Sequence, residues 1–468
     1  MKMKKIIAAA LAMAMALSLA ACGNKDNGSQ GSQGSQNPGS QGGSQSQGGS
    51  QNTPDPAPAG GAELVLWTYP VGGWGEESNV QPIMDAFKAD TGITVKVEYL
   101  AYGDGDDKVN TAIGAKAAPD LIMEGPERLV TNWGAKGYLV DMSDILTDTD
   151  KSEISAAALA ACTSADGKLY EYPLCMTAHC MGINLDAFKA AGADQYLDLE
   201  NHTWTTEGFI KAVEALYAKK GDTVAAIFCK GQGGDQGTRA LINNMYGGTF
   251  TNADHTAYTW DDPNNIKALE QLKSMPGIAF DASLEGGDEL KLMYQEILDM
   301  AFCWNIAQQL DPATAHTGAG KTINGQEIVC MNFPTESGAP VLQGGIWGLG
   351  IFDNGDQAKI DAAKEFVKWM CASENAAQGI KISNFFPARN TVNGTDLTAI
   401  FDGSDSGDIM KDYNKVILPN LGDYYQVTKG WAAARTEWWN MLQKIGKGED
   451  ITASVAEHLA NANAAAAG

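Results

Sequence analysis

A break in composition near Gly61 separates a segment that cannot form a hydrophobic core from one that can. Residues 23–61 are almost entirely Gly, Ser, Gln, Asn and Pro, without apolar periodicity. Such a segment buries too little apolar surface to offset the entropy lost on folding, so we expect it to be disordered. As a flexible coil it would reach about 35 Å on average. Any fold must therefore come from residues 62–468, a length that suggests two domains or lobes.

The N-terminus has the pattern of a secretory signal. Lysines among the first five residues precede an apolar stretch over 6–19, which is shorter than the about 20 residues needed to span a bilayer. The sequence Leu-Ala-Ala-Cys that ends at Cys22 resembles a bacterial lipobox. The resemblance implies that residues 1–21 are a signal peptide and that the Cys22 thiol carries a lipid. The alternative is an ordinary signal peptide that ends in cysteine by chance.

With a lipid on Cys22, residues 22–61 become a tether for an extracytoplasmic domain at the cell membrane. No later apolar run reaches spanning length, so we expect a protein that is anchored to the membrane without crossing it. The formal net charge is −24 at pH 7. This acidic excess argues against nucleic acid as a partner, because phosphates need Lys and Arg. It permits neutral or cationic ligands.

The cysteine and acidic patterns do not indicate a metal or a cofactor. Besides Cys22, the cysteines are scattered, mostly in apolar stretches such as 227–229 and 301–304. An odd, scattered set does not form a disulfide framework, so we expect buried free thiols. The absence of a CxxC pair and the scattered histidines argue against a zinc site. The acidic loop over 104–107 lacks the rest of a calcium-binding pattern, so we interpret it as a solvated turn.

Strands and helices alternate along the folded part. Apolar strands over 64–67, 94–99 and 120–123 alternate with helices, the first over 82–90. This order indicates an α/β architecture with a largely parallel sheet. Ligands of such sheets bind beyond the carboxyl ends of the strands, so the loops after the first and third strands are the first places to expect a site. Further expected elements are a helix over 204–218, strands over 223–228 and 348–352, a helix through 363–370, and a long helix around 431–445.

Several segments, in their order, are similar to the carbohydrate-binding family of extracellular solute-binding proteins, which includes maltose-binding protein. The similarity runs from about Leu64 to the last helices. The segments that carry it are Thr91-Gly92-Ile93-Thr94-Val95, Ala118-Pro119-Asp120-Leu121-Ile122, Trp133-Gly134, Asp166-Gly167-Lys168-Leu169-Tyr170 and Phe386-Pro387-Ala388-Arg389. The resemblance implies a bilobal periplasmic-binding-protein fold of type II, with two α/β lobes joined by hinge crossings.

The resemblance also implies a function and a domain organisation. A carbohydrate, expected to be an oligosaccharide, would bind between the lobes of a monomer and pass to an ABC permease and its ATPase. The expected N-terminal lobe comprises residues 62–174 and 341–382, and the C-terminal lobe comprises residues 175–340 and 390–468. The expected hinge crossings are 173–177, 332–341 and 383–390.

Sugars offer apolar faces that stack on aromatic rings, and hydroxyl groups that need donors and acceptors. Hydrogen bonds to charged groups are the stronger ones, about 1.5–3 kcal/mol each. Residues of these types lie after the first and third strands, at the first crossing, where the second lobe should reach the ligand, and at positions that match family aromatics. The candidate ligand-binding residues are Trp67, Tyr69, Trp74, Glu127, Arg128, Thr177, Asp235, Arg239, Trp304, Trp347 and Trp431.

The resemblance supports some candidates more directly than others. Glu127 and Arg128 follow the third strand, where the family often places an acid–arginine pair, although a surface ion pair is the alternative. Trp304 and Trp431 match family aromatics. Packing is the alternative for Trp431, because it shares a helical stripe with Trp438.

The loop after the first strand departs from maltose-binding protein. That relative has an acid and a lysine there, whereas this chain has Thr68-Tyr69-Pro70 and a Gly-rich turn. Thr177 stands where the relative has a glutamate. Maltose itself is therefore not the expected ligand. Glu124 and His179 are weaker candidates.

Three other functions are open at this point. An exported glycoside hydrolase would need two carboxylates about 5–10 Å apart, which Glu124 and Glu127 could supply. The same fold could bind a polyamine or an amino acid derivative, but such a site should place acids at the aromatic cluster. A structural surface lipoprotein would show no ligand-induced closure. We expect a binding protein and no enzyme.

Overall fold

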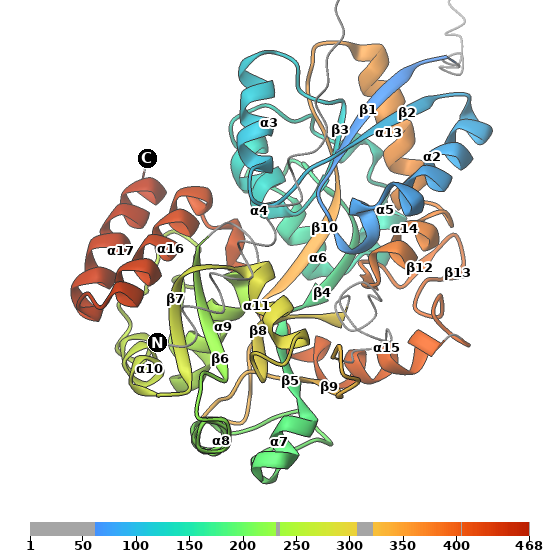
Figure 1. The fold of residues 1–468 in the computed structure, drawn as a ribbon. Helices are drawn as coiled ribbons and strands as arrows, with labels where there is room; N and C mark the ends of the chain where they lie inside the picture. Colours follow the sequence, from blue (N-terminus) through green and yellow to red (C-terminus); the bar gives the residue numbers. More distant parts are fainter. Residues whose placement is uncertain (1–60, 231–234, 307–321, 404, 468) are drawn as a thin grey trace, which may run out of the picture. The chain divides into compact units, whose positions relative to one another are not determined.

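The computed structural model describes residues 61–230, 235–306, 322–403 and 405–467. The predicted signal peptide, Cys22 and nearly all of the predicted tether lie outside the described residues. The strands and helices form two lobes, each built around its own β-sheets (Figure 1). We call the lobe that contains β1 the N-terminal lobe and the other the C-terminal lobe.

Within the described residues, the N-terminal lobe is built on a six-stranded sheet of order β11-β4-β10-β3-β1-β2. Its strands are β1 (Glu63–Thr68), β2 (Thr94–Tyr99), β3 (Leu121–Glu124), β4 (Tyr172–Ala178), β10 (Gly344–Ile351) and β11 (Phe386–Pro387). β1 pairs in parallel with β2 and β3, but β10 runs antiparallel to both β3 and β4. The expectation of a largely parallel sheet is therefore wrong for this lobe. The antiparallel strands are those that the chain adds as it passes between the lobes.

The C-terminal lobe contains two smaller sheets among the described residues. One has the order β8-β5-β9, and the other pairs β6 with β7 in parallel. The strands are β5 (Cys180–Asn184), β6 (Ala225–Lys230), β7 (Ile278–Glu285), β8 (Met300–Trp304) and β9 (Ile328–Met331). The long helices α16 (Trp431–Lys447) and α17 (Ile451–Ala467) lie side by side in this lobe (Figure 1).

Helices cover the sheets of both lobes. In the N-terminal lobe they are α2 (Glu77–Thr91), α3 (Gly105–Gly114), α4 (Pro126–Arg128), α5 (Asp148–Glu153), α6 (Ala156–Cys162), α13 (Gln357–Cys371) and α14 (Ala376–Ser383). In the C-terminal lobe they are α7 (Leu185–Ala191), α8 (Thr206–Lys220), α9 (Asp235–Tyr246), α10 (Pro263–Ser274), α11 (Gly286–Tyr294), α15 (Asp405–Val416), α16 and α17. The apolar faces of these helices supply much of the core.

The chain changes sheets within one residue at the first crossing. β4 ends at Ala178 and β5 begins at Cys180, so only His179 separates a strand of the N-terminal lobe from a strand of the C-terminal lobe. The predicted hinge at 173–177 lies inside β4. The predicted hinge at 332–341 lies between β9 and β10, and the one at 383–390 contains β11.

The expectations about the cysteines and about membrane-spanning segments can be compared with the structure directly. The cysteines of the described part, Cys162, Cys175, Cys180, Cys229, Cys303, Cys330 and Cys371, are all buried and unpaired, which confirms the prediction of free thiols. Among the described helices, none combines the length and the apolar character that a bilayer span requires.

Candidate functional site

Arg128 is the centre of a buried ionic cluster at the carboxyl end of β3. The strand ends at Glu124, and Pro126 begins the short helix α4, where a fixed φ favours the first helical position. Arg128 is only 3% exposed. Its Nε donates to Asp106 Oδ1 at 2.6 Å, and its Nη1 donates to Glu124 Oε1 at 2.7 Å. Glu127 Oε1 lies 3.4 Å from the same Nη1.

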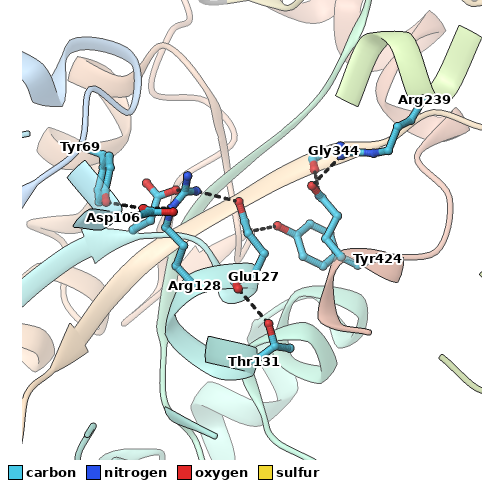
Figure 2. Close-up of polar contacts among 10 residues, drawn as sticks. Tyr69, Asp106, Glu127, Arg128, Thr131, Arg239, Gly344 and Tyr424 are labelled. Carbon is cyan, nitrogen blue, oxygen red and sulfur yellow. Dashed lines mark hydrogen bonds and ion pairs between the residues drawn. The ribbon is translucent and has the colours of Figure 1, made fainter. Parts of the chain in front are cut away.

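Two tyrosines stack beside this guanidinium. The rings of Tyr69 and Tyr102 lie 5.2 Å apart and are nearly parallel, at 25°. The Arg128 guanidinium carbon lies 5.1 Å from the Tyr69 ring centre and 5.6 Å from that of Tyr102. The Tyr69 hydroxyl donates to Asp106 at 2.6 Å (Figure 2). Gly105 permits this arrangement, because a Cβ there would lie 2.5 Å from the Tyr69 ring.

The acids of the cluster differ in their ionisation. Burial raises the pKa of Glu124 to about 8, against the opposing effect of Arg128. Burial also acts on Asp106, but Arg128 and the Tyr69 hydroxyl hold the pKa of that carboxyl below its usual value. Asp106 is therefore the ionised partner of Arg128 at neutral pH. Glu124 can change between an acceptor and a donor of hydrogen bonds near neutral pH.

A second cluster forms around Arg239 on α9. Arg239 is fully buried, and its Nε and Nη2 donate to Tyr425 Oη at 3.2 Å and to Gln426 Oε1 at 3.1 Å. Its guanidinium carbon lies 4.8 Å from the centre of the Trp431 ring and 5.4 Å from the centre of the Phe250 ring. Burial lowers the pKa of Arg239. The structure thus brings together two of the sequence-predicted residues, Arg239 and Trp431.

The segment just before α16 joins the two clusters. The Tyr424 hydroxyl donates to Glu127 Oε2 at 2.7 Å, and Gln426 Nε2 donates to the Gly344 carbonyl at 2.9 Å. Figure 2 shows Glu127 between the side chains of Arg128 and Tyr424. The Thr131 hydroxyl holds the Glu127 backbone by donating to its carbonyl oxygen at 2.8 Å. One carboxylate therefore receives bonds from an N-terminal-lobe arginine and from a tyrosine about 300 residues later in the chain.

Several buried polar atoms near the lobe interface have no hydrogen-bond partner among the described residues. They are Glu124 Oε2, Arg128 Nη2, Thr177 Oγ1, His179 Nδ1 and Gln343 Oε1. Buried polar groups in proteins are nearly always hydrogen-bonded. A set of donors and acceptors of this kind suits a small molecule that carries groups able to both donate and accept.

The other predicted residues lie outside the two clusters. Trp74 is buried in the N-terminal lobe, and its indole donates to the Gly379 carbonyl at 3.0 Å. Trp304 is buried in β8 and packs so closely on Gly182 that a Cβ there would lie 2.7 Å from its ring. Trp347 stacks on Phe385 at 4.6 Å. A role in ligand binding stays a prediction for each of them.

Three further predicted residues have different surroundings. Thr177 is buried in β4, next to the crossing, and the weaker candidate His179 is the residue of the crossing itself. Trp67 is partly exposed in β1 and lines a surface hollow with residues that precede β3. Asp235 begins α9, but its side chain lies outside the described part.

The sequence interpretation missed several members of the clusters. Asp106 was expected in a solvated turn, but it lies in the first turn of α3 and its side chain is only 19% exposed. Its pairing with Arg128 explains the difference. Tyr102, Tyr424 and Tyr425 were not singled out, although the Tyr424-Tyr425 doublet gives a weak aromatic signal. Arg435 on α16 was also missed. Burial and the neighbouring Arg128 lower its pKa to about 10.

No group of three or more His, Cys, Asp or Glu side chains within the described residues is placed to hold a metal ion. The clusters consist of arginines, carboxylates and aromatic rings. Such groups recognise polar organic molecules through hydrogen bonds and stacking.

Comparison with known proteins supports the architecture. The family model for bacterial extracellular solute-binding proteins matches residues 73–377. Comparison with curated protein sequences gives no match.

Similar solved structures share the fold at low sequence identity. An ABC transporter solute-binding protein from Agrobacterium radiobacter, in complex with ribitol, is 20% identical at a TM-score of 0.69, over 87% of this chain and 100% of that one. A substrate-binding protein from Listeria monocytogenes, in complex with cycloalternan, is 17% identical at a TM-score of 0.64, over 86% of this chain and 98% of that one. The maltose/maltodextrin-binding domain MalE from Bdellovibrio bacteriovorus, bound to maltotriose, is 14% identical at a TM-score of 0.64, over 86% of this chain and 99% of that one. The predicted bilobal α/β fold is confirmed.

Proposed function

Because the chain belongs to the bacterial extracellular solute-binding protein family, we propose that it captures a neutral carbohydrate or polyol and delivers it to an ABC permease and its ATPase. The observation that carries the proposal is the Arg128 cluster, joined to the Arg239 cluster through Glu127 and Tyr424. These residues combine ionised donors and acceptors with aromatic faces. Carbohydrate recognition requires both.

The unpartnered atoms favour a ligand rich in hydroxyl groups. Glu124 Oε2 and Arg128 Nη2 belong to side chains already joined by a hydrogen bond. A pair of adjacent hydroxyl groups can donate to the first atom and accept from the second. Each hydroxyl also retains the capacity to bond to a further group.

A polyamine fits these clusters less well. Its ammonium groups would need carboxylates that are not already compensated, whereas Asp106 and Glu127 both receive bonds from Arg128. Burial also favours the neutral form of Glu124. The similar proteins in complex with ribitol, cycloalternan and maltotriose support the same ligand class.

Ligand access requires the lobes to separate. Glu124, Glu127, Arg128 and Trp431 are each at most 6% exposed. A ligand can reach them only when the Tyr424–Glu127 bond between the C-terminal segment and the N-terminal lobe opens. Closure around the ligand would then be the state that the permease recognises.

The membrane anchor completes the proposed function. Lipidation of Cys22 and a flexible tether would keep a monomeric, extracytoplasmic binding protein close to its permease. The supporting observation is the lipobox-like sequence. Cys22→Ser should abolish incorporation of radiolabelled palmitate and move the protein from the membrane fraction to the medium. Palmitate incorporation that persists in this variant would contradict the anchor.

Calorimetric titration of the full chain tests the ligand class. Ribitol, tagatose, maltotriose and cycloalternan are the carbohydrate probes, and spermidine and a mixture of amino acids are the competitors. We expect one or more carbohydrate probes to bind and Arg128→Ala to remove that binding, while the surface variant Glu63→Gln retains it. Binding of spermidine or an amino acid, without binding of any carbohydrate probe, would refute the proposal.

A further inference from the structure

A hollow with a volume of about 420 Å³ opens on the N-terminal lobe, away from the Arg128 cluster. Its lining includes Trp67, Glu98, Lys116, Asp120, Asn354 and Lys359. The volume is within the range of pockets that hold small molecules. Asp120 immediately precedes β3, whereas Glu124 ends it. At the rise of an extended strand these positions are about 13 Å apart, so the hollow is separate from the clusters described above.

Trp67 supplies an aromatic surface in this hollow. It lies in β1, between the buried residues Leu66 and Thr68, and is itself only partly buried. Glu98 is its register partner in the neighbouring strand β2, so both side chains lie on the same face of the sheet. A partly exposed indole beside a carboxylate can stack on a ring and bind its substituents at the same time.

Hydrogen bonds fix the walls of the hollow. Asp120 accepts from the Val65 backbone at 2.9 Å and from Lys359 Nζ at 3.1 Å. Asn354 Nδ2 donates to the Pro119 carbonyl at 3.1 Å. These groups are used within the protein, and they hold the loop before β3 against the start of α13. The hollow is therefore shaped before any ligand arrives, which reduces the ordering that binding must impose.

Two charged groups in the lining are not used in this way. The side chains of Glu98 and Lys116 make no hydrogen bond or ion pair within the part of the chain that the structure describes, although the Lys116 backbone N–H donates to the Ile113 carbonyl. Lys116 also has a left-handed backbone, with φ +57°, just after α3. Glycine adopts this conformation at lower cost, so the lysine occupies a position that its backbone does not favour.

We propose that this hollow is a second binding site, for a neutral pyranose ring. The ring stacks its apolar face on Trp67, donates a hydroxyl hydrogen to the Glu98 carboxylate, and accepts a hydrogen bond from Lys116. The charges favour a neutral ligand. Lys116 repels a cation, Glu98 repels an anion, and the Asp120–Lys359 pair is already compensated, while the Asp356 carboxylate, which also lines the hollow, caps the N-terminus of α13. This site is independent of the clusters between the lobes.

Nuclear magnetic resonance of the indole N–H groups in the full chain tests the proposal. The probes are the methyl glycosides of glucose, galactose, mannose and xylose, and Trp67→Phe identifies the Trp67 signal by its loss. We expect at least one glycoside to shift this signal saturably. Glu98→Gln and Lys116→Ala should each weaken the interaction about tenfold, the effect of one charged hydrogen bond. Lys96→Ala, on the same face of β2, is the matched control and should have no effect.

The Arg128→Ala background separates this site from the proposed function. Persistence of the Trp67 shift in that background supports a second site, even if binding between the lobes is lost. The proposal is overturned if no glycoside moves the Trp67 signal, or if Glu98→Gln and Lys116→Ala leave the response unchanged. A saturable response to phenylalanine or benzylamine, with none to the glycosides, would assign the hollow to another ligand class and overturn it as well.

Discussion

Two buried arginines of the N-terminal lobe have similar partners but different surroundings. Arg389, in the third crossing, donates to Asp150 at 2.8 Å through Nη1, to Glu153 through Nη2 and to the Thr391 carbonyl at 3.0 Å through Nε. Each of the three guanidinium nitrogens of Arg389 therefore donates a hydrogen bond within the protein. Arg128 likewise bonds to carboxylates, but its Nη2 and Glu124 Oε2 have no partner among the described residues.

The carboxylates of the two networks also differ. Asp150 accepts from the Thr147 hydroxyl and backbone, which closes the capping box of α5. These bonds, with Arg389, hold its pKa below the usual value although burial opposes them. Glu124 has no such cap, and burial raises its pKa to about 8. A saturated network stabilises the fold, whereas an unsaturated one retains bonding capacity for a ligand.

The largest expected effect is on stability, in Arg389→Ala. Removal of one partner leaves Asp150 and Glu153 near each other without their cation, and losses of about 3–5 kcal/mol are typical for a broken buried pair. Denaturant unfolding of the full chain measures this loss. Arg128→Ala should lose less, because Glu124 can take up a proton when its cation is gone. Equal losses in both variants would remove the distinction between the networks.

The reverse order is expected for ligand affinity. Arg128→Ala removes the donor that organises Glu124 and Glu127, and we expect affinity for the bound carbohydrate to fall by about 100-fold, the equivalent of one or two charged hydrogen bonds. Arg389→Ala should leave affinity nearly unchanged when it is measured by calorimetry at a temperature where the variant is folded. If Arg389→Ala weakens binding as much as Arg128→Ala, then the saturated network also contributes to the site.

The two networks should respond to pH with opposite signs. The raised pKa of Glu124 means that the folded state holds a proton that the unfolded state releases. Its contribution to stability is complete below about pH 4.5 and is lost as pH rises through about 8. Asp150 has a lowered pKa, so its contribution is present above its unfolded value and is lost as pH falls through the folded one.

Unfolding free energies measured from about pH 2 to pH 9 test this contrast, because the Asp150 contribution changes below its unfolded pKa and the Glu124 contribution changes above its own. The free energy of unfolding of the original protein minus that of Glu124→Gln should decrease as pH rises, by at most about 1.4 kcal/mol per pH unit for one group. The free energy of unfolding of the original protein minus that of Asp150→Asn should increase as pH rises from the acid end. Parallel pH profiles for the two variants would contradict the assigned ionisation states.

Local patterns predicted the elements better than they predicted the contacts. The strand expected over 94–99 is β2 with the same bounds, because its alternating residues report directly on one buried face. Glu127 and Arg128 were placed correctly just after β3, since position after a parallel strand is a local property. The orientation of β10 was not predictable in this way, because it depends on how the chain returns from the other lobe.

The partners of Arg128 show where sequence patterns stop being informative. Asp106 looked like part of a solvated turn, because a run of acids carries no information about a cation 22 positions later. Tyr424 meets Glu127 across 297 positions, and only the packing of α16 and its preceding segment brings them together. Trp304 matched a family aromatic, but the sequence does not reveal that its ring covers Gly182.

The smallest expected effect concerns the contact that joins the networks of the two lobes. Tyr424→Phe removes the hydroxyl that donates to Glu127 and keeps the ring, so the closed arrangement loses one charged hydrogen bond. We expect affinity to fall about tenfold while the free energy of unfolding changes by about 1 kcal/mol or less. Tyr413→Phe is a matched control, since its hydroxyl bonds to the Ala178 carbonyl beside the crossing rather than to the cluster. Small-angle scattering of the unliganded protein should show a larger average radius for Tyr424→Phe than for Tyr413→Phe, because only the former weakens the contact that must open for a ligand to enter.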